Sequence, residues 1–208
     1  MTTTAAQRAH GHLRSRILSG SLPPGTMLSE GDLAASLQMS RTPVRTALTR
    51  LQDEGWVTIY PQRGALVREL TATEVREAAQ LRRALETAGV RDAAPAQRAA
   101  LAGRLTPCLA AQDEALDRGD VTAFTQQAMA FHRAFAELTA NALVLAAYDR
   151  VADVQQLTIA RSAEQILGDP GGVRAEHHRL LELATAGDAE GFTDHLAAHQ
   201  AAHHGLQP

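Results

Sequence analysis

Residues that cross-link, anchor or export a chain are scarce in this sequence. Cys108 is the single cysteine among 208 residues, which excludes an intramolecular disulfide and a zinc finger built from cysteines. The apolar runs are too short to cross a bilayer, and the N-terminus has no continuous apolar segment of the kind found in a signal peptide. Together these absences predict a cytoplasmic protein with no membrane partner.

Lysine is absent altogether, so all 20 basic residues are arginine. Eight arginines and five acidic residues fall within residues 1–70, whereas twelve arginines and eighteen acidic residues follow. A basic first part suits contact with a polyanion, although the imbalance is small. Histidine has the opposite distribution, because seven of the nine lie at or after residue 132. The two parts of the chain therefore offer different chemistry to a partner.

Hydrophobic periodicity predicts three helices in the first part of the chain. They extend from about Thr4 to Ser19, from Ser29 to Leu37 and from Ser40 to Glu54. The period then changes, because an aromatic and β-branched run over residues 56–68, interrupted by a turn at residues 61–64, predicts a two-stranded hairpin. Three helices followed by a hairpin form the winged helix-turn-helix arrangement, which we assign to residues 1–70 as a DNA-binding domain.

After Thr71 every segment has helical periodicity. The predicted helices lie near residues 72–93, 96–118, 121–139, 141–161, 171–186 and 188–204. Six antiparallel helices of this length pack as a bundle. The predicted fold class is therefore mainly α, with a winged helix-turn-helix followed by an antiparallel six-helix bundle over residues 71–208.

The third predicted helix begins with residues suited to DNA. In a winged helix-turn-helix this helix enters the major groove, where arginine can bind both acceptors of guanine and hydroxyl groups suit phosphates. The hairpin turn places one more arginine where a minor groove or a flanking phosphate lies. The candidate DNA-binding residues are Ser40, Arg41, Thr42, Pro43, Arg45, Gln62, Arg63 and Gly64.

The stretch from Ile17 to Val67 resembles the GntR family of bacterial regulators. It contains the family's elements in order: Pro-Gly-x-x-Leu from Pro24, Glu30, Leu-Ala from Leu33, Ser-Arg-Thr-Pro-Val-Arg from Ser40, Ala-Leu from Ala47, Glu-Gly from Glu54, and Arg63-Gly64. The resemblance implies a DNA-binding transcription regulator. One residue departs from the pattern, because Gly31 stands where many relatives have an arginine that contacts DNA.

Residues from about 74 to 204 are similar to the FCD-type effector domain, found in the FadR-like branch of that family. The matching points are Arg82-Arg83-Ala84-Leu85-Glu86, Phe131-His132, Asn141, Glu176-His177, Gly187-Asp188 and His199. The resemblance implies a ligand-sensing and dimerisation domain whose effector is often a small carboxylate. It marks Arg82, Arg83 and Asn141 as candidates for effector binding, although Arg82 and Glu86 also have the spacing of a surface ion pair.

The histidines suggest a metal site, because neutral imidazole is a favoured ligand of zinc and nickel. Many FCD-type domains bind a metal through three histidines and an aspartate, and the resemblance places the histidines at His132, His177 and His199. The aspartate position is Ala128, which cannot ligate, and Gln127 points about 100° away on the helix. Two alternatives stay open: the histidines hold zinc or nickel, or they bind an anionic ligand directly.

These features predict a ligand-responsive repressor. A homodimer would place its third helices in successive half-sites of a pseudo-palindromic operator, and a small organic acid would release it. One alternative is a metal-dependent enzyme that uses the three-histidine site, and another is an architectural DNA binder. The enzyme is disfavoured because no nucleophile motif and no carboxylate at helical spacing accompanies the histidines.

Overall fold

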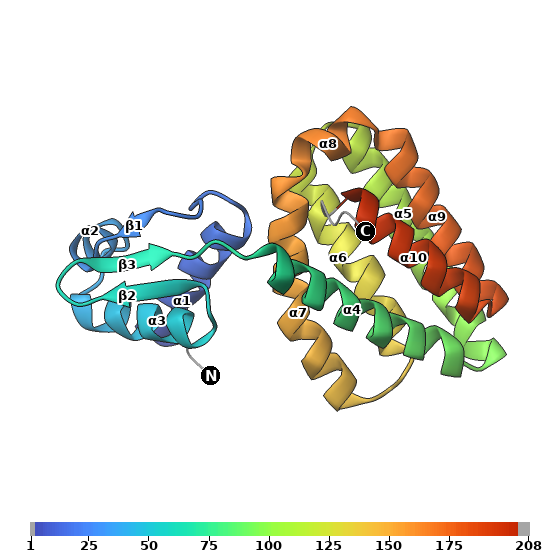
Figure 1. Ribbon diagram of the computed structural model, residues 1–208, viewed down its shortest axis with the longest axis horizontal. Helices are drawn as coiled ribbons and strands as arrows, with labels where there is room; N and C mark the ends of the chain where they lie inside the picture. The colour runs from blue at the N-terminus through green and yellow to red at the C-terminus, as the bar shows by residue number, and fades with distance from the viewer. Residues whose placement is uncertain (1–2, 204–208) are drawn as a thin grey trace. The chain divides into compact units, whose positions relative to one another are not determined.

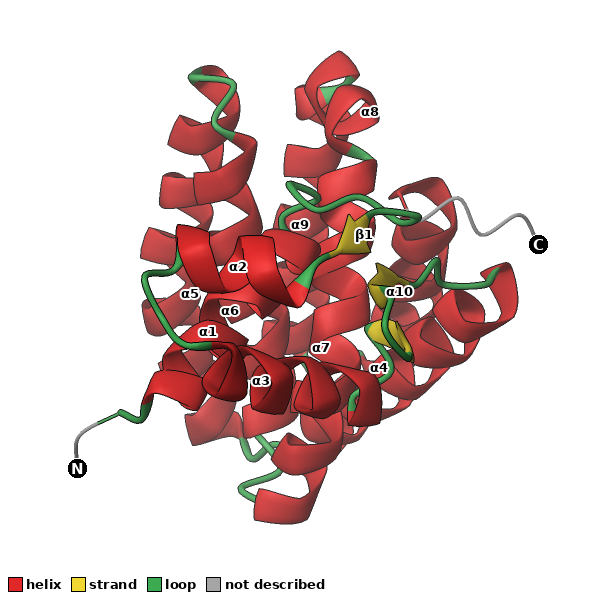
Figure 2. Cartoon of the chain, turned by 90° about the vertical axis from the view of Figure 1, so that its left-hand side faces the viewer, coloured by secondary structure: helices red, strands yellow, loops and turns green. Residues whose placement is uncertain are grey.

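The computed structural model describes residues 3–203, and the chain forms two compact units that divide between Leu70 and Thr71 (Figure 1). The predicted mainly helical fold is confirmed, and the strands of the described residues all lie in the first unit (Figure 2). The end of the last predicted helix, at residue 204, falls outside the described residues. Within the described residues, no helix is both long and apolar enough to span a membrane.

The N-terminal unit contains three helices and a small antiparallel sheet. Its elements are α1 (Ala5–Leu18), β1 (Met27–Leu28), α2 (Glu30–Ser36), α3 (Arg41–Asp53), β2 (Val57–Tyr60) and β3 (Gly64–Val67). The strand order is β1-β3-β2, so the predicted hairpin β2–β3 gains a third strand on its outer edge. Sequence periodicity missed β1, because two residues are too few to show an alternation.

Apolar residues of α1 and α3 form the core of this unit and fix the position of α3. Leu13 and Ile17 from α1 and Val44, Leu48 and Leu51 from α3 are all buried. Gly64 is required where β3 begins, because it has a φ of +110° and an added Cβ would lie 2.3 Å from the backbone oxygen of Leu28. The core and this close approach hold the hairpin beside α3.

The second unit is a helical bundle. Its helices are α4 (Ala72–Asp92), α5 (Pro95–Asp117), α6 (Val121–Glu137), α7 (Ala142–Arg161), α8 (Ala163–Gly168), α9 (Pro170–Ala186) and α10 (Ala189–His203). The six predicted helices are present, and the short α8 was not predicted. The glycines and proline of residues 168–172 indicated a loop in this region. Ile166 is nevertheless buried and packs into the core, which stabilises the short helix α8, ending at Gly168.

Helix α6 lies at the centre of the bundle and packs against α4, α5 and α7, while α10 packs against α4 and α9. The approach of α4 to α6 depends on Gly89, where an added Cβ would lie 1.9 Å from the backbone oxygen of Phe135. Phe131 and Phe135 on α6 are fully buried. A polar side chain on the same face of α6 must therefore find its partners inside the protein.

Candidate nucleic-acid interface and buried histidine cluster

A groove of about 570 Å³ opens between the start of α2, helix α3 and the tip of the β2–β3 hairpin. Five of the predicted DNA-binding residues line it: Arg41, Arg45, Gln62, Arg63 and Gly64. The side chains of the three arginines are exposed. The structure thus gathers arginines from two separate sequence segments around one concave surface that could accept a polyanion.

Arg45 has a partner that the sequence did not reveal. Its Nε and Nη2 atoms donate to the two carboxylate oxygens of Glu30, at 3.0 Å and 2.8 Å respectively. The hydrogen bond from Arg45 lowers the pKa of Glu30, so this carboxylate stays ionised. The guanidinium is therefore held over the groove in a defined direction. Because the pair is solvent-exposed, DNA can replace it at little cost.

The first turn of α3 places the other predicted contacts. Ser40 is the N-cap residue and makes no side-chain capping bond, while Thr42 is exposed and Pro43 half-buried; none of these three lines the groove. An added Cβ at Gly31 would lie 3.5 Å from Nη2 of Arg41. The guanidinium of Arg41 therefore lies next to the position where the family pattern leads us to expect an additional arginine.

In the second unit, three helices bring the predicted histidines together. His132 from α6, His177 from α9 and His199 from α10 each offer a ring nitrogen, and these nitrogens lie within 4.8 Å of one another. The three residues are only 1%, 2% and 5% exposed. Residues separated by up to 67 positions in the sequence thus form one buried cluster that is compact enough to surround a single ion.

Each imidazole in the cluster is oriented by an oxygen acceptor on its Nδ1 side. The acceptors are Oε2 of Glu86 for His132 at 3.1 Å, Oε1 of Gln112 for His177, and Oε2 of Glu176 for His199 at 2.8 Å. Oxygen acceptors call for a proton on Nδ1, so Nε2 is the ring atom with the lone pair. Metal-binding histidines typically have this arrangement.

Burial controls the charge of the cluster. It lowers the pKa of His132 and of His177 well below the usual histidine value, so both rings are neutral and able to ligate. Three imidazoles, of which at least these two are neutral, fit a divalent metal that prefers nitrogen ligands, such as zinc or nickel. Two carboxylates, those of Glu86 and Glu176, nevertheless reach the histidines, from positions that helical spacing does not connect to them.

A buried ion pair adjoins the cluster. Nε of Arg82 donates to Oε1 of Glu86 at 2.7 Å, and the hydroxyl of Tyr148 donates to the same oxygen at 3.4 Å. Arg82 and Glu86 are 2% and 0% exposed, so the surface ion pair considered from the sequence is an interior one. Burial raises the pKa of Glu86 to about 7, although Arg82 acts in the opposite direction. Nη2 of Arg82 also lies 3.3 Å from Nδ1 and 3.4 Å from Nε2 of His132, and with the proton on Nδ1 it can donate only to Nε2.

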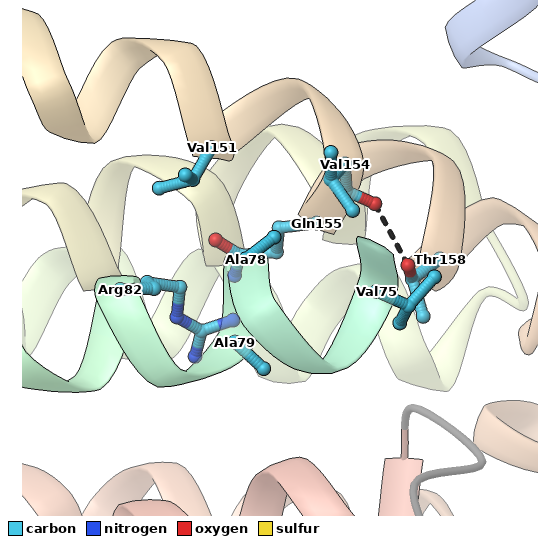
Figure 3. A pocket seen from close by; sticks show the side chains of 8 residues that line it. All are labelled: Val75, Ala78, Ala79, Arg82, Val151, Val154, Gln155 and Thr158. Carbon is cyan, nitrogen blue, oxygen red and sulfur yellow. Dashed lines mark hydrogen bonds between the residues drawn. The ribbon is translucent and has the colours of Figure 1, made fainter. Parts of the chain in front are cut away.

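The cavity beside the histidines is small. It measures about 20 Å³, and its wall includes Ala128 and Gln155 as well as the three histidines. A single water needs roughly 10–15 Å³, so the cavity accepts a water-sized group but no organic acid without expansion. A second cavity, of about 10 Å³ between α4 and α7, is lined by Arg82 and Gln155 (Figure 3).

The other two predicted effector-binding residues do not line these cavities. Arg83 is half-buried on α4 and points about 100° away from Arg82 around the helix axis. Asn141 is exposed and caps α7, where its side chain accepts from the backbone N–H groups of Leu143 and Val144. It lies about 20 Å from Gln155 along α7. Of the three candidates, the structure brings only Arg82 to the histidines.

Both units match known families. Residues 5–67 match the model of the bacterial regulatory proteins of the gntR family, and residues 77–202 match the model of the FCD domain. A protein from Paenarthrobacter nicotinovorans, named as a D-xylose utilization operon transcriptional repressor, is 31% identical over 97% of this chain and 86% of its own. The gluconate operon transcriptional repressor of Bacillus licheniformis is 30% identical over 72% of this chain and 61% of its own.

Solved structures share the fold. A GntR-type chain from Rhodococcus sp. RHA1 superposes with a TM-score of 0.80 at 27% identity, covering 98% of this chain and 99% of the other. The E. coli protein McbR/YncC has a TM-score of 0.75 at 23% identity, covering 95% of this chain and 93% of its own. The similarity extends through both units.

Proposed function

The chain belongs to the gntR family of bacterial regulatory proteins and carries an FCD domain, and on that premise we propose that it is a repressor released by a small carboxylate. It is a DNA-binding transcription regulator, and its relatives are regulators and not enzymes. Two relatives named as operon repressors favour repression over activation. A homodimer would present two α3 helices to the half-sites of a pseudo-palindromic operator.

The groove with its three arginines is the observation that carries DNA binding. Arg41 and Arg45 project from the first two turns of α3, the part of a recognition helix that meets base edges in the major groove. Arg63 at the hairpin tip suits a minor groove or a flanking phosphate. Exposed Ser40 and Thr42 suit phosphate oxygens, and Pro43 sits in the first turn, where the missing N–H has no helical partner to lose.

Operator binding tests this proposal. The protein would be used to select its preferred duplex from random DNA, and fluorescence anisotropy would then measure affinity for that duplex. We expect Arg41→Ala to weaken binding, whereas Arg50→Ala is expected to retain it, because Arg50 pairs with Glu54 on the same helix and does not line the groove. Failure to select any duplex, or equal effects of the two substitutions, would contradict the assignment.

For the sensing site, we propose that His132, His177 and His199 hold zinc or nickel through Nε2. The oriented rings, and the neutrality of His132 and His177, support this assignment. A bound divalent ion supplies positive charge that attracts a carboxylate. Because the adjacent cavity admits only a water-sized group, entry of an organic acid requires the surrounding helices to move apart.

Helix α4 is the element that would carry the signal. It begins at Ala72, only a few residues after β3 ends at Val67, and it carries both members of the buried ion pair Arg82–Glu86. An entering carboxylate that competes with Glu86 for Arg82 changes the contacts of α4 with α6. A ligand shifts an equilibrium only through such differential contacts, so movement of α4 would change the placement of the DNA-binding unit.

Two measurements test the sensing proposal. Elemental analysis should find one equivalent of metal in the purified protein and none in His132→Ala. Small carboxylates should then weaken operator binding by the wild type. Protein without stoichiometric metal would favour the direct anion site, and DNA affinity unchanged by every acid tested would favour the architectural binder.

A further inference from the structure

Gln155 on α7 contains a buried oxygen that the fold leaves unsatisfied. The side chain is 5% exposed, and its Oε1 is one of four buried side-chain atoms without a hydrogen-bond partner among the described residues. Figure 3 shows its amide extending from α7 into the interior on the side where Arg82 lies. Of these four atoms, only Oε1 of Gln155 belongs to a residue that lines the histidine cavity. A buried polar atom normally has a hydrogen-bond partner. We therefore expect the cavity to hold a bound water or ion that interacts with this oxygen.

The chemistry of the cavity wall restricts that occupant. Oε1 of Gln155 is an acceptor, and so is Nε2 of each histidine, because each Nδ1 faces an oxygen. The imidazoles therefore have no proton to donate to the amide. One of these acceptors, Nε2 of His132, also lies 3.4 Å from the donor Nη2 of Arg82. A water could donate to no more than two of these acceptors, whereas a divalent cation can interact with all of them. The convergence of acceptors on a cavity of about 20 Å³ favours a cation.

We propose that Gln155 supplies the oxygen donor that completes the three-histidine metal site, binding the ion directly or through one water. This inference rests on the metal site proposed above. Ala128 on α6 lines the same cavity, and its methyl group offers no donor atom there, whereas the Gln155 side chain on α7 does. Neighbouring Gln127 does not compete for this role, because its Oε1 lies 3.6 Å from Sγ of Cys108 and it does not line the cavity.

The identity of the donor has a consequence for metal choice. An amide oxygen carries no net charge, so the site lacks the carboxylate that hard cations such as Mn²⁺ favour. Three imidazoles and one neutral oxygen instead select zinc or nickel. The ion would also retain its full double positive charge, which strengthens attraction of an anionic effector.

The experiment compares metal binding by three full-length proteins: the wild type, Gln155→Leu and the matched control Gln127→Leu. After chelator treatment, Zn²⁺ affinity is measured by competition with a chromophoric chelator, and Co²⁺ loading is followed by its visible absorption. We expect Gln155→Leu to bind Zn²⁺ about 10- to 100-fold more weakly and to change the Co²⁺ spectrum. The control should match the wild type in both measurements.

Thermal unfolding of the metal-free proteins separates this role from a packing defect. Removing an unsatisfied buried oxygen should raise the Tm of Gln155→Leu by about 2–4 °C, whereas a packing defect would lower it. A variant that is more stable without metal and yet binds metal less tightly is the expected signature. A lower Tm together with weaker binding would overturn the assignment of Gln155 as a donor.

The remaining outcomes distinguish the two proposals. If the wild type binds neither Zn²⁺ nor Co²⁺ stoichiometrically, the metal site fails and this inference fails with it. If the wild type binds both and Gln155→Leu has the same affinity and spectrum, the metal site stands and the role of Gln155 is overturned. Gln155→Glu provides a second test: it should bind Mn²⁺ more tightly than the wild type, and affinity no greater than wild type would count against the proposal.

Discussion

Arg45–Glu30 in the N-terminal unit and Arg82–Glu86 in the bundle are both arginine–glutamate pairs, but their surroundings are opposite. The side chains of the first pair are 68% and 26% exposed, and those of the second are 2% and 0% exposed. An exposed pair contributes little to stability and exchanges readily for a phosphate or a base. A buried pair cannot lose one member without leaving a desolvated charge. The first unit thus keeps Arg45 available, whereas the second fixes Arg82 inside the bundle.

The largest expected effect comes from breaking the buried pair. Glu86→Ala should lower the free energy of unfolding of the bundle by about 3–5 kcal/mol, because Arg82 loses its buried counter-ion. The two units can be followed separately: far-UV circular dichroism is dominated by the bundle, and Trp56, the single tryptophan, lies in the N-terminal unit. Urea unfolding should therefore shift in the dichroism signal and not in the fluorescence.

Two further variants test whether burial is the cause of this loss of stability. Glu30→Ala removes the same type of residue from the exposed pair and should leave both unfolding transitions near those of the wild type. Replacing both members of the buried pair by apolar residues, Arg82→Met with Glu86→Leu, should restore most of the lost stability. Equal destabilisation by Glu86→Ala and Glu30→Ala would show that burial does not distinguish the two pairs.

Two neighbouring histidines on α9, His177 and His178, differ in burial in the same way. His177→Ala removes a buried ring from the cluster and should weaken metal binding by more than about 100-fold, beyond the effect of losing an orienting residue. His178→Ala is the matched control, because that ring is half-exposed and faces Asp113 at 3.3 Å. Chelator competition on both proteins checks the prediction. Loss of affinity in both variants would instead indicate metal binding by surface histidines.

The two units also differ in how much the sequence could predict. The candidate DNA-binding residues at the start of α3 lie in one continuous run from Ser40 to Arg45, so capping, periodicity and resemblance were enough to propose them without the structure. Gly31 and the hairpin tip were identified in the same way. The contact of Glu30 with Arg45 was missed, because fifteen residues separate them and only the packing of α2 on α3 joins them.

In the bundle, the sequence identified the three histidines through resemblance but not their surroundings. Glu86, Gln112 and Gln155 come from three other helices, and no periodicity relates one helix to the next. Asn141 was assigned to the effector site because it matches the FCD-type pattern, but its side chain caps helix α7. An asparagine at the start of a predicted helix is a capping signal, so this role could have been recognised.

In the exposed pair, Arg45 lines the groove and carries the positive charge that suits DNA. Arg45→Ala should weaken binding to the selected operator by about 5- to 150-fold and relax the preference for guanine at one position, if the side chain contacts a base. Arg63→Ala should instead weaken binding to all sequences alike, as expected for a backbone contact. Anisotropy with single-base variants of the operator makes this comparison. A uniform loss for Arg45→Ala would reassign it to a phosphate.

The smallest expected effect is a gain at Gly31. The position lies beside Arg41 on the rim of the groove, and a side chain can be added there because a Cβ meets Nη2 of Arg41 only at 3.5 Å. Gly31→Arg should add one phosphate contact and make the plot of log affinity against log salt steeper by about 0.9. Gly31→Ala should leave that slope unchanged, since it adds no charge. If neither variant changes the salt dependence of the affinity, this end of the groove faces away from DNA. The phosphate contacts would then come from α3 and the hairpin alone.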